Sequence, residues 1–176
     1  MLQNALFGGV NAAVLTAMKD DLSVDLQRSA GHAKWLLANG CNGLAVLGTT
    51  SEANSLGIEE RMAFLEGMVA GGVAAARMMP GTGTTAIPDT VKLTRHAEVQ
   101  GCRGALLLPP FYYKNPSEDG LFAYFSEVIQ RVGGDIKFYL YHFPAQSAVP
   151  FTVPFIARLL KAYPGKVKGL KDSSGD

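Results

Sequence analysis

The sequence predicts an α/β fold built around a parallel sheet. Six short apolar segments alternate with five amphipathic helical segments, and this alternation is typical of strand–helix–strand units. The apolar segments are nearly continuous, which indicates strands that are covered on both faces. Two architectures have these properties, an open doubly wound sheet and a closed (β/α)8 barrel.

The composition indicates a folded protein rather than a disordered one. With 176 residues, 48% of them hydrophobic, the chain can bury a sizeable core, and we expect one domain over residues 1–176. The formal net charge of +1 gives no reason to expect nucleic acid or a membrane surface as a partner. Cys41 and Cys102 lie outside any Cys-x-x-Cys pattern and are interpreted as reduced thiols of a cytoplasmic protein. The apolar start of the chain lacks the basic residues that open a secretory signal.

The expected elements follow from the apolar runs and the residues that flank them. The strands are expected at residues 10–15, 43–47, 76–80, 104–108, 136–141 and 167–171. The third is the weakest, because Arg77 interrupts it and Pro80 ends it. The residues expected to cap the helix starts are Gly57, Thr85, Ser117 and Thr152, and the expected helix ends are Asn39-Gly40, Gly133-Gly134 and Pro164-Gly165.

Polar, aromatic and basic residues stand where five of the predicted strands end. They are Gly48-Thr49-Thr50-Ser51-Glu52, Gly81-Thr82-Gly83, Phe111-Tyr112-Tyr113, Tyr141 and Lys171. Because the carboxyl ends of parallel strands lie at one edge of a sheet, or around one mouth of a barrel, we expect these groups to surround one cavity. The sequence therefore predicts an active site assembled from five separate segments.

Lys171 is the candidate nucleophile. It closes the last predicted strand, and a lysine held there can form a Schiff base with a carbonyl once its amine has lost a proton. Taken alone, it reads as one more surface lysine beside Lys166 and Lys168. The convergence of the other segments on the same edge favours the catalytic role.

The neighbouring segments carry groups that suit a small acid. Thr49 and Thr50, with the backbone N–H groups beside Gly48, form a neutral cradle for a carboxylate. The alternative is that these hydroxyls form hydrogen bonds only with the backbone of their own turn. Tyr141 carries a phenol that can pass protons near Lys171, and the alternative is an ordinary core tyrosine.

The remaining candidates are weaker. His142 directly follows Tyr141 and is expected near the same mouth, while Tyr112 and Tyr113 either supply a second phenol or pack a loop. The histidines and cysteines show no metal-ligand spacing, so no metal is expected. Gly81-Thr82-Gly83 is too short for a dinucleotide or phosphate loop.

The combined motifs resemble one known family. They are Gly48-Thr49-Thr50-x-Glu52, Gly81-Thr82-Gly83, Tyr112-Tyr113-x-x-Pro116-Ser117, Leu140-Tyr141-x-x-Pro144 and Gly169-x-Lys171-Asp172. In order and spacing, the set resembles the dihydrodipicolinate synthase / N-acetylneuraminate lyase family. That resemblance implies a (β/α)8 TIM barrel, here with about six strand–helix units, and a class I (Schiff-base) lyase or aldolase that joins or separates pyruvate and an aldehyde. It also implies no cofactor beyond the covalent imine, and a homotetramer built from two dimers.

The resemblance assigns roles to individual residues. Lys171 would form the imine with pyruvate or another 2-oxo acid, and Tyr141 would carry protons to and from it. Thr49 and Thr50 would hold the pyruvate carboxylate, with Thr49 also in the proton relay. Tyr113 would be the relay tyrosine that a neighbouring subunit inserts into the site.

Three positions depart from the family pattern. Ser51 stands where glycine is usual, so we expect local geometry or substrate contact to differ there. Gln146 stands where the synthase carries an arginine for the carboxylate of aspartate semialdehyde, and His142 replaces an asparagine. We count both among the substrate-binding residues. The departures leave open a 2-oxo-3-deoxy acid aldolase and 4-hydroxy-tetrahydrodipicolinate synthase, and a further alternative is a non-catalytic barrel that binds a 2-oxo acid.

The number of predicted strands bears on completeness. A barrel of this kind has eight strands in about 250 residues, and six strands alone would expose a parallel sheet edge. We therefore expect the sequence to be a piece of a longer protein, and expect residues 1–176 alone to be poorly folded or inactive. A cooperative, monomeric thermal unfolding transition would contradict that expectation.

Overall fold

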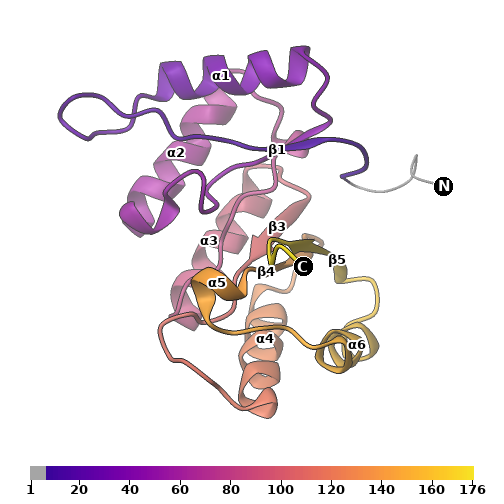
Figure 1. Cartoon of the computed structure of the whole chain (residues 1–176). Helices are drawn as coiled ribbons and strands as arrows, with labels where there is room; N and C mark the ends of the chain where they lie inside the picture. The colour runs from indigo at the N-terminus through magenta and orange to yellow at the C-terminus, as the bar shows by residue number, and fades with distance from the viewer. Residues whose placement is uncertain (1–6) are drawn as a thin grey trace. The chain divides into compact units, whose positions relative to one another are not determined.

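The structure, a computed structural model, describes residues 7–176 and divides into two compact units (Figure 1). The first unit comprises Met1–Gly81 and His96–Gly104, and the second comprises Thr82–Arg95 and Ala105–Asp176. Helix α3 (Ile87–Val99) contributes residues to both units. Within the described part of the chain, none of the helices combines the length and the apolar character that crossing a membrane requires.

In the first unit, a two-stranded parallel sheet lies beside two helices (Figure 1). Strand β1 (Asn11–Ala13) pairs with β2 (Gly43–Ala45), and helix α1 (Leu26–Ala38) contacts both β2 and α2 (Ile58–Ala70). All three residues of β2 are buried, as expected for a strand covered on both faces. Both predicted strands are therefore present, although they are shorter than the apolar runs that predicted them.

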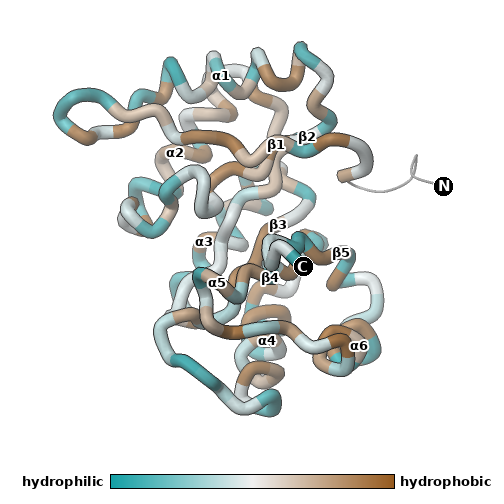
Figure 2. The backbone as a smooth tube through the Cα atoms, in the orientation of Figure 1, coloured by the Kyte–Doolittle hydropathy of each residue, from teal (hydrophilic) through white to brown (hydrophobic). Residues whose placement is uncertain are grey.

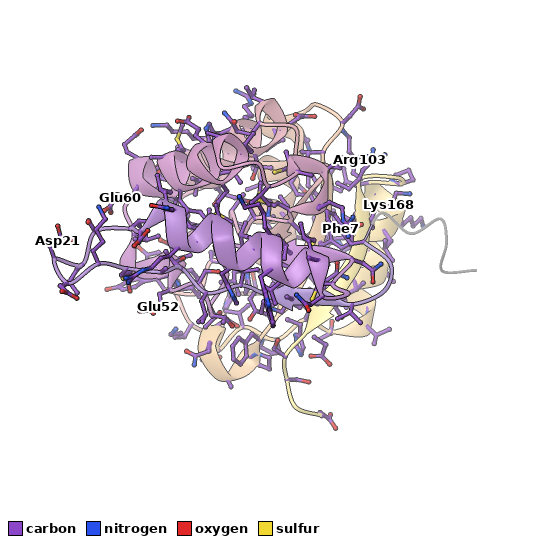
Figure 3. All side chains as sticks on the ribbon, turned by 90° about the horizontal axis from the view of Figure 1, so that it is seen from above. Phe7, Asp21, Glu52, Glu60, Arg103 and Lys168 are labelled. Atoms are coloured by element: carbon purple, nitrogen blue, oxygen red, sulfur yellow. The ribbon has the colours of Figure 1, made fainter. Side chains whose placement is uncertain are left out.

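The helix ends of the first unit follow their local sequence. The N–H of Gly57 donates to the carboxylate of Glu60 at 2.8 Å, which confirms Gly57 as the residue that opens α2. Helix α1 ends before Asn39, whose backbone N–H donates to the carbonyl of Trp35 at 3.0 Å. The loop between β1 and α1 extends away from the two helices, with Asp21 at its tip (Figure 3).

The third predicted strand differs most from the structure. Residues Ala75–Arg77 form a turn of 3-10 helix, η3, and pairing begins only at Met78, which bridges to Leu44. The guanidinium of Arg77 is held by the carbonyls of Cys41 and Asn42, so the chain is still turning at the point where we expected the strand to start. The local apolar run predicted pairing from residue 76, whereas Arg77 still belongs to η3 and the pairing starts one residue later.

In the second unit, strands β3 (Gly104–Leu107), β4 (Lys137–His142) and β5 (Val167–Asp172) are neighbours in that order. Strands β4 and β5 are parallel, with a shift of register between Phe138 and Tyr139. All three strands were predicted, and β4 and β5 each extend one residue beyond the predicted end.

Two contacting helices, α4 (Glu118–Val132) and α6 (Val153–Ala162), build much of the second unit's core. Figure 2 shows α6 as hydrophobic along much of its length, and its Phe155 is fully buried against Phe125 with ring centroids 5.8 Å apart. Such edge-on ring pairs add to the stabilisation from apolar burial. The buried face of α4 includes Leu121, Phe125, Val128 and Ile129.

Caps in the second unit are partly as predicted. The hydroxyls of Ser117 and Thr152 each accept a backbone N–H at 3.1 Å, from Gly120 and Phe155 respectively, which confirms both caps. Helix α3 starts at Ile87, two residues after the predicted cap Thr85, and it is Thr84 whose hydroxyl accepts the N–H of Ala86, at 3.2 Å. A short helix, α5 (Pro144–Ser147), was not predicted.

Candidate active site

Lys171 and Tyr141 are direct partners in the β4–β5 pair. Because paired residues of adjacent strands face the same side of a sheet, their side chains meet, and the Lys171 Nζ lies 4.0 Å from the centre of the Tyr141 ring. Tyr141 is 3% exposed, and its ring also stacks on Phe143 with centroids 5.8 Å apart. The second unit therefore brings together the predicted nucleophile and the predicted proton carrier.

The turn after Lys171 is held by hydrogen bonds to its own backbone and to β4. The N–H of Ser173 donates to the carbonyl of His142 at 2.8 Å, which prolongs the strand pairing past Lys171. The carboxylate of Asp172 accepts the N–H of Ser174 at 2.9 Å. That N–H and the Ser174 side chain hold the pKa of Asp172 below its ordinary value, with His142 as a smaller influence.

His142 lies one residue beyond Tyr141 and faces the opposite side of the strand. Its Nδ1 accepts the backbone N–H of Phe151 at 3.0 Å, and its ring lies against the Phe151 ring with centroids 5.8 Å apart. Acceptance at Nδ1 places the proton of the neutral ring on Nε2. In the structure His142 thus ties the loop before α6 to the end of β4, and its predicted contact with substrate stays a prediction.

Gln146 and Tyr113 both lie on exposed segments of the second unit. Gln146 belongs to α5, whose first residue is the proline of the Tyr-x-x-Pro motif. Tyr113 is 71% exposed and packs edge-on against the equally exposed Tyr112, with ring centroids 5.2 Å apart. An exposed aromatic pair at a loop tip is free to contact a second molecule.

In the first unit, Gly48, Thr49 and Thr50 form the turn that follows β2. The turn closes on itself, because the N–H of Glu52 donates to the carbonyl of Thr49 at 3.0 Å and the N–H of Ala53 donates to that of Gly48 at 3.2 Å. The side chains of Thr49 and Thr50 are exposed. Both threonines are therefore presented by one tight turn, as a carboxylate cradle requires.

Ser51, the first departure from the family pattern, points inward instead of toward the turn's exposed side. It is 1% exposed, its hydroxyl donates to the carbonyl of Val14 at 2.5 Å, and its own carbonyl accepts the Thr16 hydroxyl at 2.8 Å. The left-handed residue of the turn is Glu52, with φ of 53°, and not Ser51. The serine therefore anchors the turn without needing the backbone freedom of glycine.

One contact beside Lys171 was missed by the sequence reasoning. Gly169 lies two residues earlier on β5 and is the partner of Tyr139, whose ring covers it. An isolated glycine inside a strand often marks the close approach of another group, and this signal was available in the motif Gly169-x-Lys171.

The second unit also contains a cavity of about 280 Å³ that none of the predicted site residues line. Its walls come from the starts of α4 and α6 and from the loop after α5, and they are mostly apolar. Among residues 7–176, no group of three or more His, Cys, Asp or Glu side chains is placed to hold a metal ion.

Comparison with known proteins gives one consistent family. The model of the Dihydrodipicolinate synthetase family matches residues 6–176. An uncharacterized DapA-like lyase of Chloroflexus aurantiacus is 37% identical over 169 residues, which cover 96% of this chain and 56% of that protein. The 4-hydroxy-tetrahydrodipicolinate synthase of Agrobacterium fabrum is 31% identical over 170 residues, which cover 97% of this chain and 56% of that protein.

Solved structures show the same likeness. Dihydrodipicolinate synthase from Agrobacterium tumefaciens superposes with a TM-score of 0.92 at 40% identity, covering 96% of this chain and 59% of that one. YagE, a prophage protein of E. coli K12 solved in complex with pyruvate, gives 0.88 at 30% identity, covering 96% and 55%. These likenesses and the parallel strand–helix alternation confirm the (β/α)8 barrel as the fold class. The chain spans a little over half the length of the relatives that it matches.

Proposed function

Because the chain belongs to the dihydrodipicolinate synthetase family, we propose that it carries the pyruvate-binding part of a class I lyase or aldolase. The enzyme would form or cleave a carbon–carbon bond between pyruvate and an aldehyde. The observation that carries this proposal is the pairing of Lys171 with Tyr141 at the carboxyl ends of two parallel strands, with Nζ 4.0 Å from the ring centre.

The chemistry proceeds through an imine on Lys171. The neutral amine attacks the C2 carbonyl of pyruvate, and the adduct loses water to form a protonated imine. That cation withdraws electrons, so the pyruvate methyl group loses a proton and becomes an enamine carbon. The enamine carbon bonds to the aldehyde carbon, whose oxygen takes a proton, and hydrolysis of the imine releases the product and restores the amine.

Each remaining site residue has a proposed part in these steps. Tyr141 passes protons to and from the imine, together with Thr49 and with Tyr113 of a neighbouring subunit. Thr50 and the N–H groups beside Gly48 bind the pyruvate carboxylate. His142 and Gln146 are proposed to contact the second substrate.

The proposed reaction needs no metal or other cofactor, because the imine nitrogen is itself the electron sink. We further propose a single cytoplasmic domain and a homotetramer made of two dimers. The exposed Tyr112 and Tyr113 pair supports the contact between subunits that such an assembly would need.

Trapping with borohydride tests the proposal. The full-length protein is incubated with pyruvate and reduced with borohydride, and its peptides are analysed by mass. We expect an irreversible adduct on Lys171 in the wild type and none in Lys171→Arg, while Lys168 on the same strand stays unmodified in both. A folded wild-type protein without an adduct would instead support a non-catalytic barrel that binds a 2-oxo acid.

The second substrate separates two candidate activities. The relatives named 4-hydroxy-tetrahydrodipicolinate synthase favour aspartate semialdehyde, whereas the neutral Gln146 favours an uncharged, hydroxylated aldehyde. Turnover of both aldehydes by the wild type and by Gln146→Arg discriminates between them. If Gln146 faces the second substrate, the arginine raises turnover of aspartate semialdehyde relative to the uncharged aldehyde.

A further inference from the structure

We propose that Gly169 and Tyr139 are positioning residues that set the place of the Lys171 amine, an inference that rests on the proposed imine chemistry. Neither residue reaches the reacting atoms in this proposal. They act through the strand that carries Lys171.

Register places both residues directly beside the proposed catalytic pair. Tyr139 is the partner of Gly169, and two residues further along the same strands Tyr141 is the partner of Lys171. Because side chains two residues apart on a strand share a face, Tyr139, Tyr141 and Lys171 face the same side. Leu140 and Leu170, the pair between them, face the other side.

The Tyr139 ring occupies the space that a side chain at residue 169 would need. A Cβ built on Gly169 lies 2.7 Å from Cδ1 and 2.9 Å from Cε1 of that ring, closer than carbon atoms approach in proteins. The ring therefore rests on the backbone of β5. A glycine in a strand interior is otherwise unfavourable, and close approach of a neighbouring group is a physical reason for its presence.

Tyr139 also lies where the β4–β5 register changes. The shift falls between Phe138 and Tyr139, so the pairing of Tyr139 with Gly169 is the first step of the register that leads to Lys171. Phe138 is fully buried and cannot adjust easily, and burial of Tyr139 raises the pKa of its phenol above the ordinary value. Tyr139 itself is half-buried, with its ring packed against the backbone of β5 at Gly169.

A substitution at Gly169 should therefore move Lys171. An added methyl group either pushes the Tyr139 ring away or separates β5 from β4. Separation of the strands shifts the Lys171 Nζ relative to the Tyr141 ring. A displacement of about 1 Å at a reacting atom can reduce a rate by about 100-fold. We expect Gly169→Ala to slow formation of the trapped pyruvate adduct on Lys171 by at least about 10-fold.

A compensating variant distinguishes positioning from general damage. Tyr139→Val removes the ring atoms that would collide with the added Cβ but keeps a strand-forming residue. The atom Tyr139 Cγ lies 3.9 Å from that Cβ, so a side chain that ends at the γ position leaves room for it. In the full-length protein, the double variant Gly169→Ala/Tyr139→Val should recover adduct formation to within about threefold of Tyr139→Val alone. Gly31→Ala is the matched control, since its added Cβ meets no atom within 4 Å and it should react like the wild type.

Acylation with acetic anhydride tests the same geometry without pyruvate. Acetylation of Lys171 is measured relative to that of the exposed Lys168, and Gly169→Ala should change this ratio while the double variant restores it. A folded Gly169→Ala protein with wild-type adduct formation and an unchanged ratio would overturn the inference, as would a folded double variant as slow as the single one. Failure of the proposed function looks different: the wild type forms no pyruvate adduct, yet the acetylation ratio still responds to Gly169→Ala.

Discussion

The amine of Lys171 lies above the face of the Tyr141 ring, with Nζ 4.0 Å from the ring centre. The ring face attracts a cation, while the phenol hydroxyl at the ring edge can exchange protons. Tyr141 can therefore act on Lys171 in two separable ways, by attraction of the amine to the ring face and by proton exchange through the hydroxyl.

Substitutions at Tyr141 should separate these contributions. Tyr141→Phe keeps the ring but removes the hydroxyl, so we expect turnover to fall by about 100-fold to 10,000-fold while folding is retained. Tyr141→Leu also removes the ring face and should in addition lower stability, because Tyr141 is buried. Steady-state rates and thermal unfolding of the two variants check this, and a Tyr141→Phe enzyme with wild-type turnover would exclude Tyr141 from proton transfer.

Ser51 should contribute to stability rather than to substrate binding. Ser51→Ala leaves the buried carbonyl of Val14 without its hydroxyl donor, which should cost about 1–3 kcal/mol of unfolding free energy. Ser55→Ala, at an exposed position of the short 3-10 helix Ala53–Ser55 that follows this turn, is the control and should be nearly neutral. Equal unfolding midpoints for the two variants in urea would contradict this assignment.

Tyr124 should make the protein sensitive to alkaline pH. Burial raises the pKa of its phenol from 10.0 to about 12, and its hydroxyl donates to the carbonyl of Thr84 at 2.6 Å. Between pH 10 and about 12 the unfolded chain has lost this proton while the folded chain keeps it. Stability from this group is therefore complete below pH 10 and falls as the pH rises toward 12, by about 2–3 kcal/mol in all.

The test for Tyr124 is a comparison of variants across pH. Tyr124→Phe should be less stable than the wild type at pH 8 by about 2 kcal/mol, because the hydrogen bonds to the Thr84 carbonyl and the Thr90 hydroxyl are lost. This deficit should shrink toward zero between pH 10 and 12, where the wild type loses the stability that the phenol contributes. Tyr163→Phe, which removes a phenol hydroxyl that accepts the side-chain N–H of the exposed Gln130, is the matched control. A deficit of Tyr124→Phe that is constant from pH 8 to 12 would refute the assignment.

Arg158 should connect α4 and α6 only weakly. It pairs with Asp119 at 2.6 Å and lies 4.0 Å above the Phe122 ring, but the Arg158 and Asp119 side chains are 41% and 85% exposed. Arg158→Met should lower stability by less than about 1 kcal/mol, and by less still in high salt. Lys161→Met on the same helix is the control. If Arg158→Met instead lowered the unfolding free energy by several kcal/mol, water would screen the Arg158–Asp119 pair far less than its exposure implies.

The sequence predicted the elements whose signals are local. Helices α4 and α6 begin at Ser117 and Thr152 because each hydroxyl caps N–H groups within three residues. The start of the third strand was not predicted correctly, and there Arg77 contacts Cys41 and Asn42, which lie more than 30 residues away in sequence. No local pattern encodes such a contact.

The candidate site likewise has features that the local sequence predicts and others that depend on distant contacts. The sequence by itself determined which chemical groups stand at the strand ends, among them Lys171, Tyr141 and the two threonines, because an apolar run followed by a polar turn is a local feature. Only the tertiary structure decided that Lys171 is the partner of Tyr141, that Gly169 lies under Tyr139 and that Ser51 bonds to Val14. These pairings depend on strand register and on packing between distant segments, and a shift of one residue would turn each side chain to the other face.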